Sequence, residues 1–201
     1  MRVPETARMA RPREFKEAAV LDRAVDLFWR RGFEGTVVGD VCDATGLHPG
    51  SVYGAFVDKR GLFIAALRRY AERVSAKAIG VLDETPGGAD AIRGYFALLV
   101  DAMVDGRRRS GCLMTNTLVE RHATDKTIME LVVRHLATLE AAFVRVFVRD
   151  GMDPAEAAKR AAGLVCFVQG LNVIARTRPG RARLEELVRS ALAGFVEERP
   201  T

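Results

Sequence analysis

The stretch TVVGDVCDATGLHPGSVYGAFVDKRGL, residues 36–62, places the tightest constraint on how this chain can fold. Gly46 lies between two short segments, at a point where a tight turn needs a positive φ, which glycine adopts without the steric penalty of a Cβ. Apolar or small residues stand where two helices joined by such a turn pack against each other: Val41, Cys42, Leu47, Val52 and Ala55. The spacing therefore predicts a helix-turn-helix.

The second helix of this motif is expected from His48 to Ala55, with Pro49 in the first turn, where a missing N–H costs little. Its outward-facing residues are small or polar: His48, Pro49, Gly50, Ser51, Tyr53 and Gly54. Such a face suits the floor of a DNA major groove. An ordinary helical hairpin is the alternative, and the complete spacing favours DNA binding over it.

The same stretch resembles the DNA-binding domain of TetR-family transcriptional regulators, over about residues 14–65. The residues that carry the resemblance lie in the first helix, the connector, the second motif helix and the start of the fourth helix: Ala24, Leu27, Phe28, Gly32, Phe33, Thr36, Tyr53, Phe56, Lys59 and Leu62. The resemblance implies a homodimeric regulator, most often a repressor, that a small-molecule ligand releases from a palindromic operator. Gly54 and Ala55 replace bulkier residues of the common family pattern, which implies fewer base contacts than usual.

We expect seven residues to contact double-stranded DNA: Thr36, His48, Pro49, Gly50, Ser51, Tyr53 and Lys59. Thr36 is also expected to cap the second helix, and its phosphate contact is implied by the resemblance. Asp58 is expected to cap the fourth helix, where Lys59 adds a charged phosphate contact. Residues 1–13 hold four arginines and one glutamate, which fits either an arm on the DNA or a frayed tail.

Composition narrows the class of protein but does not identify it. The 201 residues, 49% hydrophobic and 28% charged, are typical of a globular chain. No run reaches the roughly 18 apolar residues of a membrane helix, and the N-terminus is unlike a secretory signal, so we expect a cytoplasmic protein without a membrane partner. The net charge is +5, yet residues 1–63 hold ten Lys or Arg and nine Asp or Glu. The motif, and not the charge, indicates DNA.

The complete pattern predicts an all-α fold of about nine helices. Residues 1–60 are expected to form the helix-turn-helix domain with its basic arm, and residues 61–201 a helical ligand-binding and dimerisation domain. The last two helices, about residues 154–198, carry apolar residues at helical spacing and are expected to form a two-fold dimer. A dimer is also required mechanistically, because one recognition helix buries too little surface to select one site.

Aromatic, sulfur-containing and isolated polar residues of the second domain are the candidate ligand contacts: Phe96, Val100, Met103, Asn116, Glu120, His135, Phe143, Phe167, Gln169 and Asn172. An ordinary helical core uses the same residue types. Cys112 has a Gly-Cys-Leu setting similar to that of relatives whose cysteine senses electrophiles or oxidants. Arg107–Arg109 precede it and would favour the thiolate. An inert, buried cysteine is the alternative.

Enzymatic function finds little support in the sequence. There is no Ser/His/Asp set, glycine-rich phosphate loop or metal cluster, and Glu120 with His122 or His135 is the only acid–base grouping. The three cysteines and three histidines are scattered, so we expect no disulfide, metal or cofactor. A helical adaptor that binds protein through its helix-turn-helix is a third class.

Overall fold

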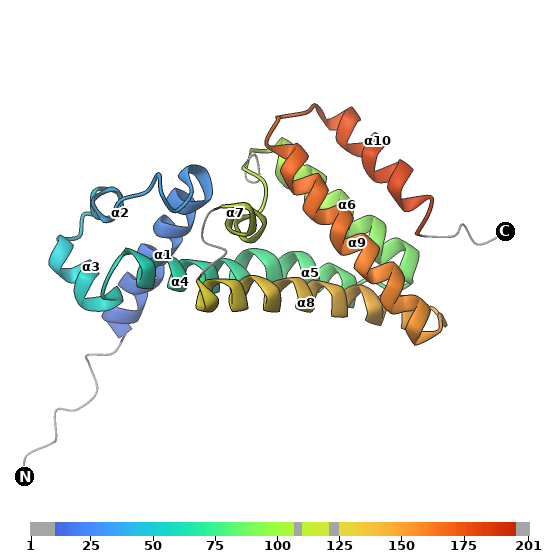
Figure 1. The fold of residues 1–201 in the computed structure, drawn as a ribbon, viewed down its shortest axis with the longest axis horizontal. Helices are drawn as coiled ribbons and strands as arrows, with labels where there is room; N and C mark the ends of the chain where they lie inside the picture. The colour runs from blue at the N-terminus through green and yellow to red at the C-terminus, as the bar shows by residue number, and fades with distance from the viewer. Residues whose placement is uncertain (1–10, 107–109, 121–124, 196–201) are drawn as a thin grey trace, which may run out of the picture. The chain divides into compact units, whose positions relative to one another are not determined.

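The computed structural model describes residues 11–106, 110–120 and 125–195. Their regular structure is helical throughout (Figure 1): α1 Arg11–Arg31, α2 Val38–Thr45, α3 Pro49–Phe56, α4 Lys59–Tyr70, the π-helical η1 Ala71–Ser75, α5 Ala76–Glu84, α6 Gly88–Val104, α7 Leu113–Val119, α8 Lys126–Arg149, α9 Pro154–Ala175 and α10 Arg181–Leu192. Because α4, η1 and α5 are continuous, these ranges contain nine helical segments, and the predicted all-α fold is confirmed.

The chain divides into two compact units, Met1–Arg69 and Tyr70–Thr201. The division falls inside the continuous helix formed by α4, η1 and α5, and the functional boundary expected after residue 60 stays a prediction. The predicted N-terminal arm lies mostly outside the described residues. Within the ranges that the structure describes, no helix is long and apolar enough to cross a membrane.

Three phenylalanine rings form the centre of the N-terminal unit. The ring of Phe63, on α4, lies 4.8 Å from that of Phe28, on α1, and 5.0 Å from that of Phe33, in the connector. Arg69 adds an ion pair to Asp22, with 2.9 Å between Nε and Oδ1. α1 and α4 are thereby fixed to each other, and they support α2 and α3.

The C-terminal unit has a continuous apolar core built by α5, α6, α8, α9 and α10. The rings of Tyr95, Phe96 and Phe143 lie at its centre, with 5.3 Å from the Tyr95 ring to each of the other two. α10 contributes the buried side chains of Leu184 and Leu192. This packing fixes the face that α6 turns toward α10.

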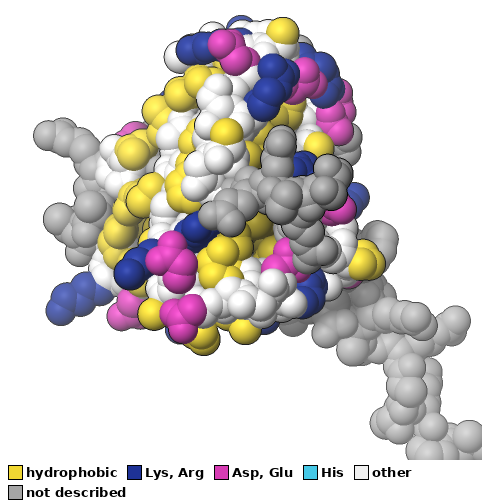
Figure 2. Space-filling view, turned by 90° about the vertical axis from the view of Figure 1, so that its right-hand side faces the viewer, with side chains coloured by type: hydrophobic (Ala, Val, Ile, Leu, Met, Phe, Trp, Pro, Cys, Tyr) yellow, Lys and Arg dark blue, Asp and Glu magenta, His cyan; other side chains and the backbone are white. Residues whose placement is uncertain are grey.

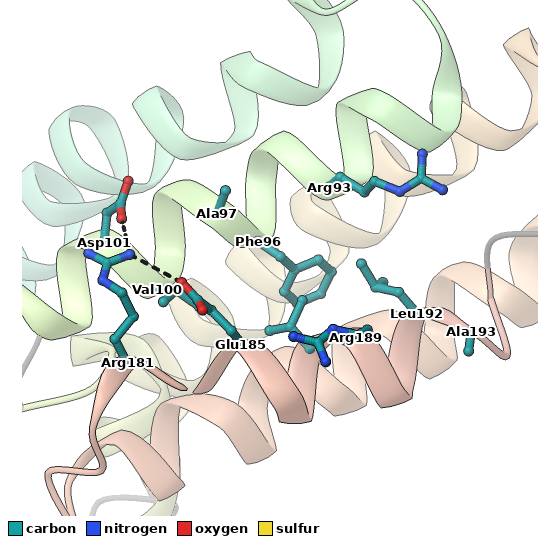
Figure 3. Close-up of a pocket in the computed structure, with 11 residues that line it drawn as sticks. Arg93, Phe96, Ala97, Val100, Asp101, Arg181, Glu185, Arg189, Leu192 and Ala193 are labelled. Carbon is teal, nitrogen blue, oxygen red and sulfur yellow. Dashed lines mark hydrogen bonds and ion pairs between the residues drawn. The ribbon is translucent and has the colours of Figure 1, made fainter. Parts of the chain in front are cut away.

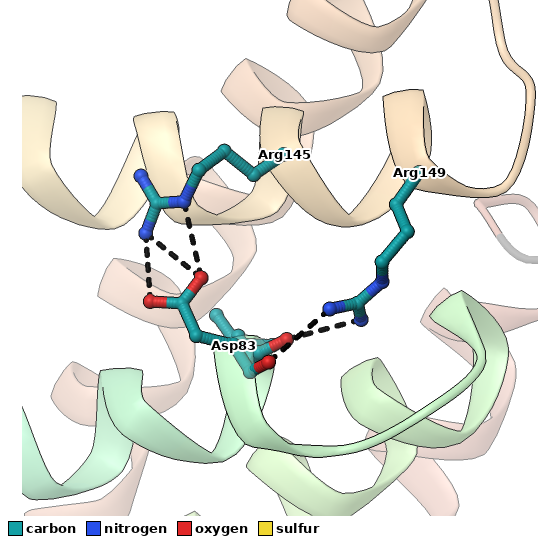
Figure 4. Close-up of polar contacts among 4 residues, drawn as sticks. Asp83, Arg145 and Arg149 are labelled. Atoms are coloured by element: carbon teal, nitrogen blue, oxygen red, sulfur yellow. Dashed lines mark hydrogen bonds and ion pairs between the residues drawn. The ribbon is translucent and has the colours of Figure 1, made fainter.

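The end of α8 holds the end of α5 (Figure 4). Arg145 makes a bidentate ion pair with Asp83, with nitrogen–oxygen distances of 2.9 and 3.0 Å. Arg149 donates to the carbonyl oxygens of Leu82, Asp83 and Thr85 at 3.0 to 3.3 Å. These carbonyls end a helix and have no partners within it, so the guanidinium caps α5.

Asp150, the residue that follows α8, caps the N-terminus of α6. Both carboxylate oxygens of Asp150 accept from the Gly88 N–H, at 2.8 and 2.9 Å, at the first residue of α6. A carboxylate at a helix N-terminus meets the positive end of the helix dipole. The Pro86–Gly87 turn is therefore held on both sides by one short stretch, residues 145–150.

Candidate nucleic-acid interface

The turn between α2 and α3 has the predicted geometry. Gly46 lies in the left-handed region, with φ 68° and ψ 16°. Val41 and Val52 are buried on either side of it. The prediction that Ala55 packs inside is wrong: Ala55 is exposed, and Phe56 is buried. Phe56 follows Val52 by four residues, so the two share the inner face of α3.

The outer face of α3 is open to solvent, as the sequence predicts. The exposed residues are His48, Pro49, Gly50, Ser51, Tyr53 and Gly54. A Cβ placed at Gly50 or Gly54 would meet no heavy atom of the described residues within 4 Å. Tyr53 has the largest side chain on this face, and it is 49% exposed. The result is a flat, uncharged surface that allows close approach to the helix backbone.

Thr36 does not have its predicted capping role. The N-cap of α2 is Val37, and the Thr36 hydroxyl donates instead to the Gly32 carbonyl oxygen at 2.8 Å. Thr36 is fully buried. It closes the end of α1, because the residue can still reach the last carbonyls of the preceding helix. Its phosphate contact, which the resemblance implies, stays a prediction.

The N-terminus of α2 is stabilised by Asp40 in place of Thr36. The Asp40 carboxylate accepts from the Val37 N–H at 3.0 Å and pairs with Arg31 at 3.0 Å. The Val37 hydrogen bond, followed by the Arg31 contact, holds the pKa of Asp40 below its usual value. The charged form of this exposed carboxylate is therefore favoured in the folded state.

A tight junction connects α3 to α4. Val57 has φ 67° and ψ −55°, and the Asp58 N–H donates to the Phe56 carbonyl at 2.8 Å, which is a strained γ-turn. Asp58 then accepts from the Gly61 N–H at 2.6 Å, which confirms its predicted cap. A Cβ at Gly61 would collide with the Phe56 carbonyl oxygen, so the close approach requires glycine here.

Lys59 is held at this junction. Its Nζ lies 4.2 Å from the centre of the Phe33 ring, a cation–π contact that fixes the ammonium group beside the start of α4. The side chain is half-buried. A fixed cation at a helix N-terminus is a suitable arrangement for a phosphate oxygen.

The predicted ligand residues do not form one site. Phe96 and Val100 line a cavity of about 690 Å³ between α6 and α10. His135, Gln169 and Asn172 line a separate cavity of about 20 Å³, with Cys112 in its wall. The other five residues line neither cavity. Met103 and Phe143 are buried in the core, and the Phe167 ring packs against that of Phe96. Asn116 donates to the Ser110 carbonyl oxygen, and Glu120 follows the end of α7.

Sequence reasoning missed the α10 side of the larger cavity. Arg181, Glu185 and Arg189 recur every four residues along α10 and line this cavity. The four-residue spacing of these charged side chains, beside the apolar stripe of the same helix, is the sequence signal that points to a second lined face. From the sequence, we interpret the whole helix as part of the dimer surface.

Cys112 lies just before α7 and is buried. The Tyr70 hydroxyl donates to its Sγ at 3.3 Å. The predicted effect of Arg107–Arg109 on the thiol falls outside the described residues. In the part of the chain that the structure describes, no group of three or more His, Cys, Asp or Glu side chains is arranged to hold a metal ion.

Comparison with known families and proteins agrees with this geometry. Residues 20–66 match the model of bacterial regulatory proteins of the tetR family, and residues 88–190 match the LmrA/YxaF-like transcriptional regulator C-terminal domain. The HTH-type transcriptional repressor ComR of Escherichia coli K12 is 31% identical over 204 residues, covering 93% of this chain and 92% of the repressor. The HTH-type regulator YezE of Bacillus subtilis is 34% identical over 142 residues, 70% of this chain and 73% of YezE.

Solved structures show the same fold. The regulator CifR, in complex with a 26-bp operator duplex, superposes with a TM-score of 0.78 over 95% of this chain and all of its own, at 24% identity. Reduced NemR of Escherichia coli gives 0.76 over 89% of this chain and 95% of its own, at 18% identity.

Proposed function

The chain belongs to the TetR family of bacterial transcriptional regulators, and we propose that it is a homodimer that a small-molecule ligand releases from a palindromic operator. It is a DNA-binding transcriptional repressor and not an enzyme. The observation that supports operator recognition most directly is the exposed outer face of α3, presented by a buried helix-turn-helix core.

We propose that α3 enters the major groove with its outer face toward the bases. His48 and Ser51 reach base edges or phosphates, and the Tyr53 hydroxyl bonds a phosphate oxygen. Gly50 and Gly54 leave the backbone close to the groove floor. Lys59 adds the charged phosphate contact. Because these side chains are short and few, base-edge contacts supply only part of the specificity, and DNA shape supplies the rest.

We propose that two copies associate through the outer faces of α9 and α10. Apart from Lys159, the outward side of α9 is small or apolar, and an apolar helix face of that kind is covered in the functional state. Its exposed side carries small or apolar residues at steps of three and four: Ala155, Ala158, Ala162, Cys166, Gly170 and Val173. Small side chains allow two helices to cross closely about a two-fold axis. Operator binding requires such a dimer to hold its α3 helices roughly 34–36 Å apart, in successive major grooves.

The salt dependence of operator binding tests the DNA contacts. Each neutralised phosphate contributes about −0.9 to the slope of log affinity against log salt concentration. Lys59→Gln removes one contact from each subunit, so we expect the slope to become shallower by about 1.8. A duplex selected from a random pool, titrated at several salt concentrations, provides the measurement.

Lys77→Gln, on the exposed side of α5, is the matched control and should leave that slope unchanged. Equal slopes for Lys59→Gln and the unsubstituted protein would remove Lys59 from the interface. Failure of any duplex to bind at low salt would overturn operator recognition as a whole.

A second mode of release, through oxidation or alkylation of Cys112, is supported by the hydrogen bond from Tyr70. That bond places an O–H donor on the sulfur, where it would stabilise a thiolate against the cost of burial, and the thiol lines the small cavity. We expect Cys112→Ser to abolish release of operator DNA by a small electrophile such as methylglyoxal. Cys166→Ser, a change of similar size on the proposed dimer surface, should preserve both the dimer and the release. Unchanged release by Cys112→Ser contradicts the sensor.

A further inference from the structure

We propose that the groove between α6 and α10 binds an amphipathic organic anion, a molecule with an apolar body and one carboxylate or sulfonate group. The groove is the cavity of about 690 Å³, a volume within the usual range of small-molecule sites. All residues that line the groove belong to the C-terminal unit. That the bound anion is the effector rests on the proposed function.

The floor of the groove is apolar. Phe96 and Val100 from α6 meet Val188 and Leu192 from α10, and three of these four side chains are buried against the core beneath. Figure 2 shows the side of the molecule on which α10 lies, where hydrophobic surface is visible between side chains of both charges. Val188 is the one of these four that keeps partly exposed surface, and an apolar body laid along the groove would cover it together with the exposed Ala97 and Ala193.

The charges at one end of the groove are paired with one another. Arg181 lies 2.7 Å from Asp101 and 3.6 Å from Glu185 (Figure 3). The Asp101 hydrogen bond raises the pKa of Arg181 above its usual value. Both carboxylates thus share a permanent cation, and this end of the groove attracts a ligand cation less than two free carboxylates would.

Arg189 supplies a cation for which the described residues provide no ion-pair partner. It stands two turns along α10 from Arg181, beside Phe96 and Leu192 at the apolar floor (Figure 3). Arg93, across the groove on α6, pairs with Asp90 at 3.3 Å, and both side chains are more than half exposed. A guanidinium at the edge of an apolar floor binds a carboxylate or sulfonate in two parallel hydrogen bonds. The ligand's body would then lie over Phe96.

A second copy of the chain is a less suitable occupant. The surface proposed for dimerisation is the outer side of α9 with the adjoining side of α10, where Arg183 and Glu186 pair with each other. Arg189 and Val188 lie on the groove side of the same helix. A small ligand and a partner subunit can therefore occupy the C-terminal unit together.

The test compares three ligands of one chain length, octanoate, octanol and octylammonium, by calorimetric titration of the full chain. We expect octanoate to bind at least about tenfold more tightly than either of the other two. Arg189→Gln should lower octanoate affinity about tenfold and leave octanol affinity unchanged. Arg134→Gln, the same change at an exposed arginine of α8 outside the groove and the proposed dimer surface, should have no effect on either ligand.

Two results would overturn the proposal: octylammonium binding as tightly as octanoate, or equal octanoate affinities for Arg189→Gln and Arg134→Gln. Ala97→Phe, which fills the groove from its exposed α6 wall, should weaken octanoate and octanol together, which separates the groove from other apolar surfaces. Titration of the operator with and without octanoate measures whether the bound anion changes operator affinity, separately from octanoate binding itself. Octanoate binding without a change in operator affinity rejects the effector assignment and supports the site.

Discussion

Replacing Gly54 with glutamate is expected to abolish operator binding while the protein keeps its fold. The new side chain points outward from α3, where a Cβ meets no heavy atom of the described residues within 4 Å, so it requires no repacking. In the proposed complex its carboxylate faces the negatively charged groove at short range and loses its hydration. We expect the affinity to fall by more than about 100-fold, which corresponds to about 2.7 kcal/mol.

Gly54→Ala is the matched control for this experiment. Alanine fits the same open position and stabilises a helix interior by roughly 0.5–1 kcal/mol relative to glycine. Duplex titration and thermal melting of both variants separate a loss of operator binding from a loss of stability. If Gly54→Glu bound the selected operator as tightly as Gly54→Ala, α3 would not be the element that enters the groove.

Ala162→Arg is expected to produce a monomer that binds the operator about 1,000-fold more weakly than the dimer does. Ala162 lies at the middle of the exposed stripe on α9, so each new guanidinium would meet its symmetry mate without a counter-ion. An unpaired buried charge costs several kcal/mol, more than a close helix crossing regains. Loss of the dimer also removes the second recognition helix from each binding event.

Sedimentation at about 10 μM protein reads the oligomeric state directly, since a stable dimer has a dissociation constant well below that concentration. Ala141→Arg, at an exposed alanine of α8, introduces the same charge away from the proposed interface and should leave a dimer. A dimeric Ala162→Arg would exclude α9 as the dimer surface. A monomer in the unsubstituted protein would exclude the dimer itself.

Several helix ends carry local signals that can be read in the sequence. Asp153 accepts from the N–H groups of Ala155 and Glu156, with Pro154 as the first helical residue, which is a common pattern at a helix start. Asp125 caps α8 in the same way. Gly46 turns the chain where the motif requires it. Each of these features depends on residues within four positions of one another, and the stereochemistry of such short segments is readable without tertiary structure.

The ligand cavities were harder to predict because they depend on contacts between distant segments. Arg181 and Asp101, which pair at one end of the groove, are 80 residues apart in the chain. The sequence indicates that α6 and α10 are amphipathic, but not which side of α10 turns toward α6. The capping prediction for Thr36 was wrong for a smaller reason of the same kind: its hydroxyl could accept from an N–H at the start of α2 or donate to a carbonyl at the end of α1, and it donates to the Gly32 carbonyl.

The stretch from Arg145 to Asp150 has a consequence for the order in which the C-terminal unit assembles. Its hydrogen bonds to residues 82–88 join positions 62 to 67 apart in sequence. Long loops must close before such contacts form, so nascent α5 and α6 keep free ends until α8 has been synthesised and has docked. During translation, the bend at Pro86–Gly87 therefore becomes fixed only after a segment about 60 residues further along the chain has left the ribosome.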